Sequence, residues 1–508
     1  MTKPIPRPVA SPQLTIGEPL QFPADDNAVE GPIVVSIACS PEDDSTAVPL
    51  AAASALDAAS GGVLATWLAD GNASGKAGEI CMAALPTKDG SVATVVMVGI
   101  GDVDELTRDS LFRHGSAVIR QLASQPRSKI VVAMGLDVPS KFHDALVAGC
   151  LFGCEGQAIY RQNPSTHVGD AIEFSGVSAE MLTRGQTIGQ SINLTRRLVN
   201  EPPSIMNPTE FANRSVAMAS EVGLGSEVWD ETRLADERCE AILAVGRGSA
   251  SPPCLLKLQH AGGGDDQPPV VIVGKGVTFD SGGLSLKPSE GMVDMKCDMA
   301  GAATVVGVMH AIAKLGVGLN VIGLCGLAEN MVSGDSYKLG DVIQTRSGKT
   351  IEILNTDAEG RVVLADTLDV AVEQAPAAIV DLATLTGACM VALGNETAGL
   401  MTNDESLCNE LTDAAKAEGE PVWELPMFKL FDDKVHSKVA DIKNVGEGRW
   451  GGAITAAKFL ENFVAEVPWL HIDIAGPAFA DSPKPDRDAG ATGVMVRTLI
   501  RWIENQAN

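Results

Sequence analysis

Two kinds of segment alternate along most of the chain, and this alternation limits the fold more than any other feature of the sequence. Short apolar segments rich in β-branched residues, as at residues 32–39, 92–98 and 129–134, have the composition of buried parallel strands. Residues 108–124 and 140–157 show the spacing of apolar residues that is typical of helices. This repeated exchange predicts an α/β fold built on a parallel sheet.

A polar stretch at residues 161–169 interrupts the alternation. After a strand-like segment at residues 171–174, a long helical pattern at residues 179–199 ends before Pro202 and Pro203, which cannot continue a helix. The exchange of strands and helices then resumes. Further strands are expected at residues 270–273, 320–324, 351–354, 378–381 and 470–474, and further helices at residues 299–315, 361–374, 454–463 and 494–504.

The length of 508 residues allows more than one domain of about 150 residues. We predict two α/β domains that divide between residues 175 and 176. The smaller N-terminal α/β domain, residues 1–175, begins with a loose arm at residues 1–30, where proline and acidic residues are frequent. The larger C-terminal α/β catalytic domain, residues 176–508, opens with the connecting helix, and its sheet is expected to be mixed, mostly parallel and flanked by helices.

The charge of the chain narrows the range of partners. With 65 acidic and 38 basic residues the formal net charge is −27, which repels phosphate backbones and anionic lipid. Neither a secretory signal nor an apolar stretch of the ~20 residues that span a bilayer is found. The 10 cysteines include no Cys-x-x-Cys pair and are typical of a reducing compartment. We therefore expect a cytoplasmic protein that binds neither membrane nor nucleic acid.

Two short motifs resemble nucleotide-binding loops, but each lacks a glycine that such a loop requires. The glycines Gly99 and Gly101 follow a strand, but the third glycine of a dinucleotide loop would fall on Asp104. Residues 347–350, Ser-Gly-Lys-Thr, lack the leading glycine of a phosphate loop, since Ile343 occupies its place, and a hairpin turn is expected there. The 7 histidines are too widely spaced for a local zinc motif, and none is assigned to a site.

Two glycine-rich segments carry the residues for chemistry: residues 273–288, followed closely by 295–303, and residues 353–361. Each is expected to begin where an apolar strand ends, which is where ligands bind in parallel α/β sheets. Taken alone, Asp298 and Asp357 could be helix caps. The density of charged residues favours a site instead, and its candidates are Lys275, Asp280, Lys287, Asp298, Asp357, Glu359 and Arg361.

The carboxylates in this set require compensation. If the four converge, they cannot all ionise at close range unless cations are present, and two divalent ions would balance them. Oxygen ligands suit Mn²⁺ or Mg²⁺, and also Zn²⁺. Two such ions can share a bridging water and polarise a carbonyl or phosphoryl oxygen, with Lys287 and Arg361 left to stabilise an anion. The residues predict a two-metal hydrolase and leave amide and phosphate ester substrates open.

Residues 355–361, Asn-Thr-Asp-Ala-Glu-Gly-Arg, resemble the signature of the leucine aminopeptidase (cytosol aminopeptidase) family of dinuclear metallopeptidases. Residues 198–202, 381–387 and 471–476 resemble the same family. The resemblance covers roughly residues 185–508, and the first ~170 residues resemble only the family's variable N-terminal α/β domain.

The resemblance implies a ligand for each metal position. Asp280 and Glu359 would be shared by both metals, Asp357 would complete one site, and Lys275 and Asp298 would complete the other. A lysine ligand must lose its proton, which neighbouring dications favour. The implied cofactors are two divalent ions per subunit, Mn²⁺ or Zn²⁺ foremost and Mg²⁺ as a further option, with bicarbonate near Arg361.

The resemblance also implies roles in catalysis and binding. Lys287 would polarise the scissile carbonyl and Arg361 would hold the bicarbonate that acts as general base. Pro477 and Ala478 stand where some relatives carry methionine, so we expect a roomier pocket with broad apolar preference, leucine included. The side-chain pocket would be formed by Met295, Thr384, Gly387 and Ala475, with backbone contacts from Leu385.

The function implied by the resemblance is a metal-dependent aminopeptidase that hydrolyses N-terminal amino acids from peptides through a metal-bridged water, in a homohexamer. A two-metal phosphoesterase is one alternative, disfavoured by the few cations available for phosphate. A DNA-binding regulator with secondary peptidase activity is another, disfavoured by the net charge of −27 and by the lack of a Lys/Arg-rich run.

Overall fold

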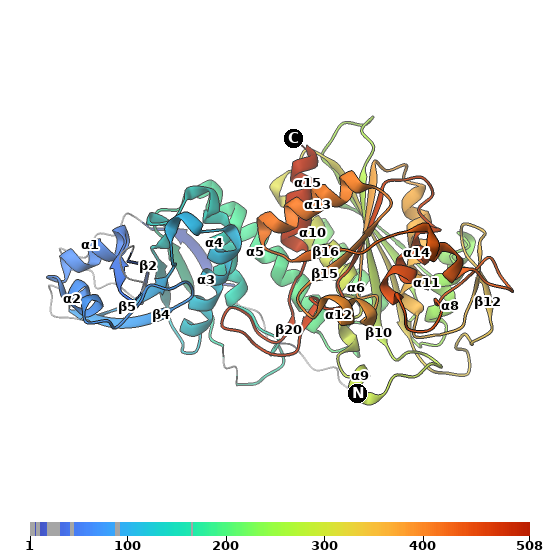
Figure 1. The fold of residues 1–508 in the computed structure, drawn as a ribbon, viewed down its shortest axis with the longest axis horizontal. Coiled ribbons are helices and arrows are strands. Elements are labelled where there is room, and N and C mark those ends of the chain that lie inside the picture. The colour runs from blue at the N-terminus through green and yellow to red at the C-terminus, as the bar shows by residue number, and fades with distance from the viewer. Residues whose placement is uncertain are drawn as a thin grey trace. The chain divides into compact units, whose positions relative to one another are not determined.

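The computed structural model describes residue 6 and residues 11–17, 31–40, 45–86, 92–163 and 166–507. The chain forms two compact units, the first comprising Met1–Asn193 with Ser482–Ala489 and the second Leu194–Asp481 with Gly490–Asn508. Both units are α/β, which confirms the predicted fold class (Figure 1).

The first unit contains a seven-stranded sheet in the order β1-β7-β6-β2-β5-β4, with β3 paired to β2. All pairs along this order are parallel except β5 with β4. Its strands are β1 (Gln13–Ile16), β2 (Ile33–Cys39), β3 (Ala47–Pro49), β4 (Ile80–Pro86), β5 (Val92–Gly99), β6 (Lys129–Val132) and β7 (Ala171–Phe174). Its helices are α1 (Ala51–Ala59), α2 (Val63–Ala69), α3 (Arg108–Leu122) and α4 (His143–Gly153).

Both faces of this sheet are covered, which explains why its strands are apolar without alternation. Val34 of β2 packs into a cluster with residues of α3 and α4. The neighbouring residues Ile33 and Val35 point to the other face and pack with residues of α1 and α2. Successive side chains of a strand alternate between faces, so a strand buried on both sides needs apolar residues at every position.

The expected loose arm is wrong for residues 13–16, which form β1. This strand pairs in parallel with β7, Gln13 opposite Ala171, and Leu14 packs against the core of the unit. The prediction used the composition of the whole arm, which is rich in proline and acidic residues. The four residues of β1 include Leu, Thr and Ile, which are compatible with an edge strand. Residues 1–5, 7–10 and 18–30 of the arm, and residues 164–165 of the polar stretch, lie outside the described residues.

The predicted connecting helix is α5 (Ala179–Asn200), and it belongs to both units. The part of α5 that belongs to the first unit ends at Asn193, whose Nδ2 donates to the carbonyl oxygen of Leu151 of the same unit at 2.9 Å. In its last turns Thr195 Oγ1 donates to the carbonyl oxygen of Ala303 within the second unit, at 3.0 Å. The compact units therefore divide inside a continuous helix, and a boundary between residues 175 and 176 stays a prediction.

Burial of His114 in α3 predicts an acid-sensitive stability. The side chain is 6% exposed, and burial lowers its pKa from 6.5 to about 4. Since the folded pKa lies below the unfolded one, the contribution of the neutral ring to stability is complete above pH 6.5 and is lost as the pH falls toward 4. We expect this residue to reduce the free energy of unfolding by about 2 kcal/mol between pH 7.5 and pH 5.

Urea unfolding of the unmodified chain and of His114→Gln at these two pH values measures the effect. The variant should lose that part of the pH dependence, whereas His167→Gln, which alters a half-exposed histidine of the same unit, should keep it. Equal pH dependence in the unmodified chain and His114→Gln would contradict the prediction.

The second unit is built on an eight-stranded sheet in the order β16-β15-β18-β14-β10-β11-β9-β8. The pairs β16-β15, β18-β14, β14-β10 and β10-β11 are parallel and the other three are antiparallel, so the sheet is mixed and mostly parallel, as predicted. Its strands are β8 (Gly225–Trp229), β9 (Cys254–Ala261), β10 (Val270–Asp280), β11 (Asn320–Asn330), β14 (Ala378–Ala383), β15 (Ala398–Thr402), β16 (Val422–Glu424) and β18 (Trp469–Asp473).

Smaller sheets and helices complete this unit. The small strands are β12 (Val342–Gln344), β13 (Thr350–Glu352), β17 (Ile442–Lys443), β19 (Phe479–Ala480) and β20 (Gly490–Ala491). The helices are α6 (Pro208–Val222), α7 (Glu231–Asp236), α8 (Glu240–Gly246), α9 (Ser289–Met292), α10 (Ala300–Leu315), α11 (Glu359–Val372), α12 (Gly387–Leu393), α13 (Glu405–Glu418), α14 (Gly452–Glu461) and α15 (Val496–Ala507). Residues 345–349 join β12 to β13 in a hairpin, so Ser347, Gly348 and Lys349 lie in a hairpin turn, as predicted.

Helices α10 and α11 cover opposite faces of the large sheet (Figure 1). A Cβ atom at Gly323 of β11 would lie 2.8 Å from Val305 Cγ1 of α10. A Cβ atom at Gly326, three residues further along the strand and on the other face, would lie 2.3 Å from Thr367 Oγ1 of α11. Glycine at these positions lets both helices approach the centre of the sheet closely.

The two central strands are longer than predicted. Strand β10 continues through residues 274–280, which we expected to form a glycine-rich loop, and β11 continues to Asn330. The glycines of β10 serve close packing, because a Cβ atom at Gly274 would lie 2.5 Å from Ala302 Cα and one at Gly276 would lie 2.5 Å from Leu327 Cδ2. The expected strand end before Lys275 is therefore wrong, and this lysine lies within β10.

One described stretch, Ser289–Leu315, has the length and hydropathy of a membrane-crossing helix. Its most apolar window is 78% buried inside the protein, as in the core helix of a globular fold, so it is weak evidence for a membrane span.

Candidate active site

All the residues predicted for the site line one cavity of about 970 Å³ in the second unit. The cavity lies at the carboxyl ends of β10, β14 and β18, since Asp280 ends the first strand and Thr384 and Ala475 follow the other two. This is the position at which parallel α/β sheets bind ligands. The residues that the structure brings together are Lys275, Asp280, Lys287, Met295, Asp298, Asp357, Glu359, Arg361, Thr384, Leu385, Gly387 and Ala475.

Lys275 projects from β10 into a buried set of acceptors. Its Nζ lies 2.7 Å from Asp298 Oδ1 and 2.9 Å from Glu359 Oε1, and it donates to the carbonyl oxygen of Thr384 at 3.0 Å. Although burial opposes the charged form, the two carboxylates raise the pKa of Lys275 above its usual range. In the absence of metal this amine is therefore an ammonium group that holds two carboxylates together.

A tight turn after β10 brings Lys287 back to the carboxylates. Gly282 and Gly283 have φ values of 83° and 59°, in the left-handed region that favours glycine. The backbone N–H of Lys287 then donates to the carbonyl oxygen of Ser281 at 3.0 Å. Lys287 Nζ lies 2.8 Å from Asp280 Oδ2 and 2.6 Å from Asp357 Oδ1, so each lysine of the site bridges two carboxylates.

The helix-cap explanation for Asp298 and Asp357 is wrong. The residue before α10 is Met299 and the residue before α11 is Ala358, and neither helix has a side-chain cap. Asp298 accepts instead from Lys275 and from Thr384 Oγ1, the latter at 2.8 Å. Both aspartates are thus directed at the cavity rather than at a helix terminus.

Gly360 leaves the space through which the side chain of Lys275 passes. A Cβ atom at this position would lie 2.4 Å from Lys275 Cε and 2.6 Å from its Nζ. Helix α11 begins at Glu359, so the glycine lies in the first turn, beside the lysine. The position of the lysine amine therefore depends on the absence of a side chain at Gly360.

The carboxylates fit a divalent cation. Oxygen atoms of Asp280, Asp357 and Glu359 lie within 4.8 Å of one another. Asp298 Oδ2 and Glu359 Oε2 are buried without a hydrogen-bond partner, which is costly unless a cation completes them. Burial, and then the neighbouring carboxylate of Glu359, raises the pKa of Asp280, and burial raises that of Asp298 well above its usual range. This donor set suits a hard or borderline metal ion.

Arg361 supplies a further cation to the cavity. The side chain is 9% exposed, and burial lowers its pKa from 12.5 to about 10, opposed by Glu359 and Asp473. Its Nε is buried without a hydrogen-bond partner. A buried guanidinium group with a free donor can bind an anion in the cavity.

Asp473 at the end of β18 holds the loop that carries the predicted substrate contacts. Its Oδ1 accepts from the backbone N–H of Leu385 at 3.2 Å and of Thr386 at 3.4 Å, and its Oδ2 accepts from Thr386 Oγ1 at 2.7 Å. Asp473 is fully buried. These hydrogen bonds to Asp473 hold the loop that follows β14 in place.

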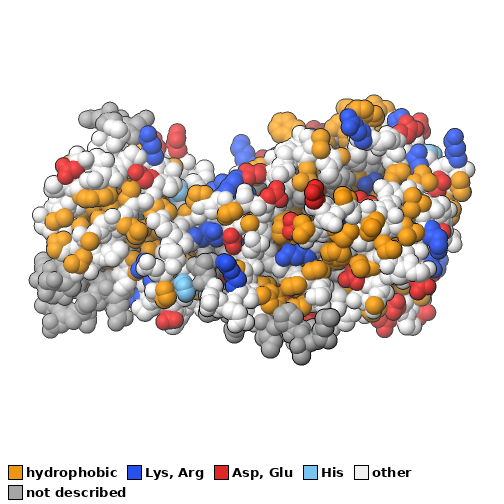
Figure 2. Space-filling view, turned by 90° about the horizontal axis from the view of Figure 1, so that it is seen from below, with side chains coloured by type: hydrophobic (Ala, Val, Ile, Leu, Met, Phe, Trp, Pro, Cys, Tyr) orange, Lys and Arg blue, Asp and Glu red, His pale blue; other side chains and the backbone are white. Residues whose placement is uncertain are grey.

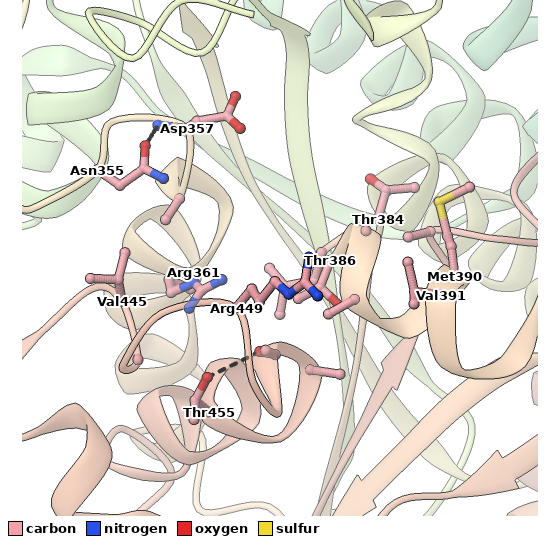
Figure 3. A pocket seen from close by; sticks show the side chains of 18 of the residues that line it. Asn355, Asp357, Arg361, Thr384, Thr386, Met390, Val391, Val445, Arg449 and Thr455 are labelled. Atoms are coloured by element: carbon pink, nitrogen blue, oxygen red, sulfur yellow. Dashed lines mark hydrogen bonds between the residues drawn. The ribbon is translucent and has the colours of Figure 1, made fainter.

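Three features that support or line the cavity were not predicted from the sequence. Asn330 donates to Asp280 Oδ1 at 2.8 Å and to the carbonyl oxygen of Thr356 at 2.9 Å, and the end of β11 would have indicated it if that strand had been predicted at full length. Asp473 is a second. The third is the loop that includes Val445 and Arg449, which lies opposite Met390 and Val391 in the view of Figure 3. The sequence of this loop is rich in glycine and matches no motif that would have indicated a site.

Comparison with known families agrees with this geometry. Residues 193–500 match the model of the catalytic domain of the cytosol aminopeptidase family. Residues 34–164 match the model of the N-terminal domain of the same family.

Individual relatives and solved structures point the same way. The chain is 70% identical over 435 residues to a probable cytosol aminopeptidase of Rhodopirellula baltica, covering 86% of this chain and 85% of the relative. It is 38% identical to a probable cytosol aminopeptidase of Pseudomonas syringae pv. tomato, covering 91% and 94%. The bottromycin maturation enzyme BotP in complex with Mn is similar in structure, with a TM-score of 0.83, 33% identity and coverage of 94% and 100%. A cytosol aminopeptidase structure from Coxiella burnetii has a TM-score of 0.80 at 31% identity, covering 95% and 99%.

Proposed function

The chain belongs to the cytosol aminopeptidase family and is a metal-dependent aminopeptidase, and from this premise we propose that it removes N-terminal amino acids, apolar ones such as leucine foremost, from peptides with a free N-terminus. The observation that carries the proposal is the convergence of four carboxylates with Lys275, Lys287 and Arg361 on a single cavity at the strand ends. A free α-amine is protonated in solution, and the carboxylates of this cavity attract that cation; a bound metal would coordinate the amine once it has lost its proton.

We assign the metal positions to the carboxylates and to Lys275. Asp280, Asp357 and Glu359 supply clustered oxygen atoms, and Lys275 Nζ lies 2.7 Å from Asp298 Oδ1 and 2.9 Å from Glu359 Oε1. Mn²⁺ is our first candidate, since the similar enzyme BotP is described in complex with Mn, with Zn²⁺ or Mg²⁺ as alternatives. Two bound dications would acidify the attacking water, bridged between them, and polarise the peptide carbonyl.

The remaining charged residues would act on the substrate directly. Lys287 would donate to the carbonyl oxygen as it gains negative charge, because a bound metal relieves the lysine of its two carboxylate partners. Arg361 would hold bicarbonate, which accepts a proton from the water. Met295, Thr384, Gly387 and Ala475 would form the side-chain pocket, and the backbone of Leu385, fixed by Asp473, would orient the peptide.

Two alternatives receive less support. A two-metal phosphoesterase is disfavoured by the match of residues 193–500 to the catalytic domain of the cytosol aminopeptidase family. A DNA-binding regulator would need a basic surface. On the face drawn in Figure 2, lysines and arginines are interspersed with acidic residues across the described part of the chain.

We further propose that the protein is a homohexamer located in the cytoplasm, as the family resemblance implies.

Chelation followed by metal replacement tests the proposal. The metal-loaded protein should release p-nitroaniline from leucine p-nitroanilide, lose this activity after treatment with a chelator, and regain it with Mn²⁺ or Zn²⁺. Leucine should be preferred over glycine when the two anilides are compared, because the pocket wall is apolar. N-acetyl-leucine p-nitroanilide is the control and should not react, since its amine is blocked. Activity that survives full metal removal, or equal cleavage of the acetylated substrate, would contradict the assignment.

A further inference from the structure

Arg449 is the one charged residue of the cavity, as far as the described residues show, that neither pairs with a carboxylate nor belongs to the assigned catalytic set. Lys275 and Lys287 are paired with carboxylates, and Arg361 is already assigned to an anion. The nearest acidic residue in the sequence, Glu447, is two residues before Arg449 and is paired with Lys434 at 2.7 Å. A cation without a partner at the edge of a cavity is available to a ligand.

The loop that carries Arg449 is attached to the signature segment. Asn444, which is fully buried, accepts from the backbone N–H of Leu354 at 2.9 Å and donates to the carbonyl oxygen of Asn355 at 2.6 Å. Gly448 and Gly451, with φ values of 65° and 61°, lie on either side of Arg449 and Trp450 and allow the chain to turn there. The position of the loop is thus tied to the segment that carries Asp357 and Glu359.

The guanidinium group of Arg449 packs against an aromatic ring. Its Cζ lies 4.9 Å from the centroid of the Trp450 ring, and Trp450 is 74% exposed. A guanidinium group stacked on a ring keeps its N–H edges free, and these edges match the two oxygens of a carboxylate. In the view of Figure 3, Arg449 lies between the side of the cavity with Asn355 and Arg361 and the side with Met390 and Val391.

The chemistry of a short peptide fits this arrangement. In a dipeptide or tripeptide the amine and the carboxylate are the two ends of a chain only two or three residues long, at about 3.3–3.6 Å per residue. With the amine at the carboxylate and metal end, the carboxylate of such a peptide extends along the cavity away from it. A cavity of about 970 Å³ is large enough for a ligand of this size.

We propose that Arg449 binds the C-terminal carboxylate of dipeptides and tripeptides, and thereby makes short peptides with a free C-terminus the preferred substrates. This inference rests on the proposed aminopeptidase function. Arg449 is a specificity residue in this account, and it takes no part in bond cleavage.

The test compares substrates that differ only in the terminal charge. For the metal-loaded protein, kcat/KM for Leu-Gly should exceed that for Leu-Gly-amide by about tenfold. Arg449→Gln should bring this ratio close to one, mainly through KM, and Arg449→Lys should retain part of it. Leucine p-nitroanilide, which has no carboxylate, should be cleaved by Arg449→Gln at nearly the rate of the unmodified chain.

Lys438→Gln is the matched control, because it removes one exposed positive charge outside the cavity. It should leave the ratio of acid to amide unchanged. The inference is overturned if the unmodified chain does not distinguish the acid from the amide, if Arg449→Gln keeps the ratio, or if the variant loses activity toward all three substrates alike. A metal-loaded chain that cleaves none of the three would overturn the proposed function as well, so the two failures are distinguishable.

Discussion

Glu359→Ala should lower kcat/KM for leucine p-nitroanilide by roughly 1,000-fold or more, because the change removes a carboxylate that both metals would share. Glu359 Oε1 lies 2.9 Å from Lys275 Nζ, and Oε2 is buried without a hydrogen-bond partner. In the metal-free protein the variant leaves Lys275 paired with Asp298, so the fold should persist. Metal content per chain should fall together with activity.

Kinetic assays, elemental analysis of the bound metal and circular dichroism measure the three expected results. Glu373→Gln is the control, since this residue follows the same helix, α11, and lies outside the cavity. It should bind metal and react normally. Normal turnover by Glu359→Ala would end the assignment of this residue, and an unfolded variant would be replaced by Glu359→Gln, which keeps the side-chain shape.

Lys287→Ala should lower kcat by roughly 100- to 1,000-fold while metal content stays unchanged. In the proposed function the amine of Lys287 stabilises the oxyanion, and Lys287 is not among the assigned metal ligands. The expected loss is therefore in the rate of the chemical step, with a smaller change in KM. This combination separates the role of Lys287 from that of Glu359.

Steady-state kinetics at saturating metal, with the metal content of the same samples, test this difference. Lys287→Arg should recover part of kcat, and Lys338→Ala, which removes an exposed lysine outside the cavity, should have no effect. If Lys287→Ala lost metal as well as activity, the lysine would instead be required to assemble the metal site. If it retained normal kcat, another donor would have to stabilise the oxyanion.

Local patterns were sufficient to predict most of the secondary structure. The strand expected at residues 171–174 is β7 without change, and the long helical pattern at residues 179–199 is α5 with one further residue. Apolar runs and helical spacing are local properties of the chain. The length of β10 is not, because Gly274 and Gly276 favour a loop by composition and are kept in the strand by contacts with α10 and β11.

The site divided in the same way. The charged residues at the strand ends were predictable, since acids and bases are rare in apolar surroundings and the sheet places strand ends together. Asn330 and Asp473 were missed, because an uncharged amide and a single aspartate have no distinctive local pattern. Their roles follow from hydrogen bonds to Asp280 and to the loop after β14, which only the folded chain forms.

Under the proposed function, Gly360 is required for the reaction although it contributes no reactive atom. It has no functional group, yet any larger residue would occupy the volume of the Lys275 side chain. A search for functional positions by side-chain chemistry alone would not find this glycine. A new enzyme designed on this scaffold would therefore have to keep glycine at residue 360 in order to keep the amine of Lys275 in its place.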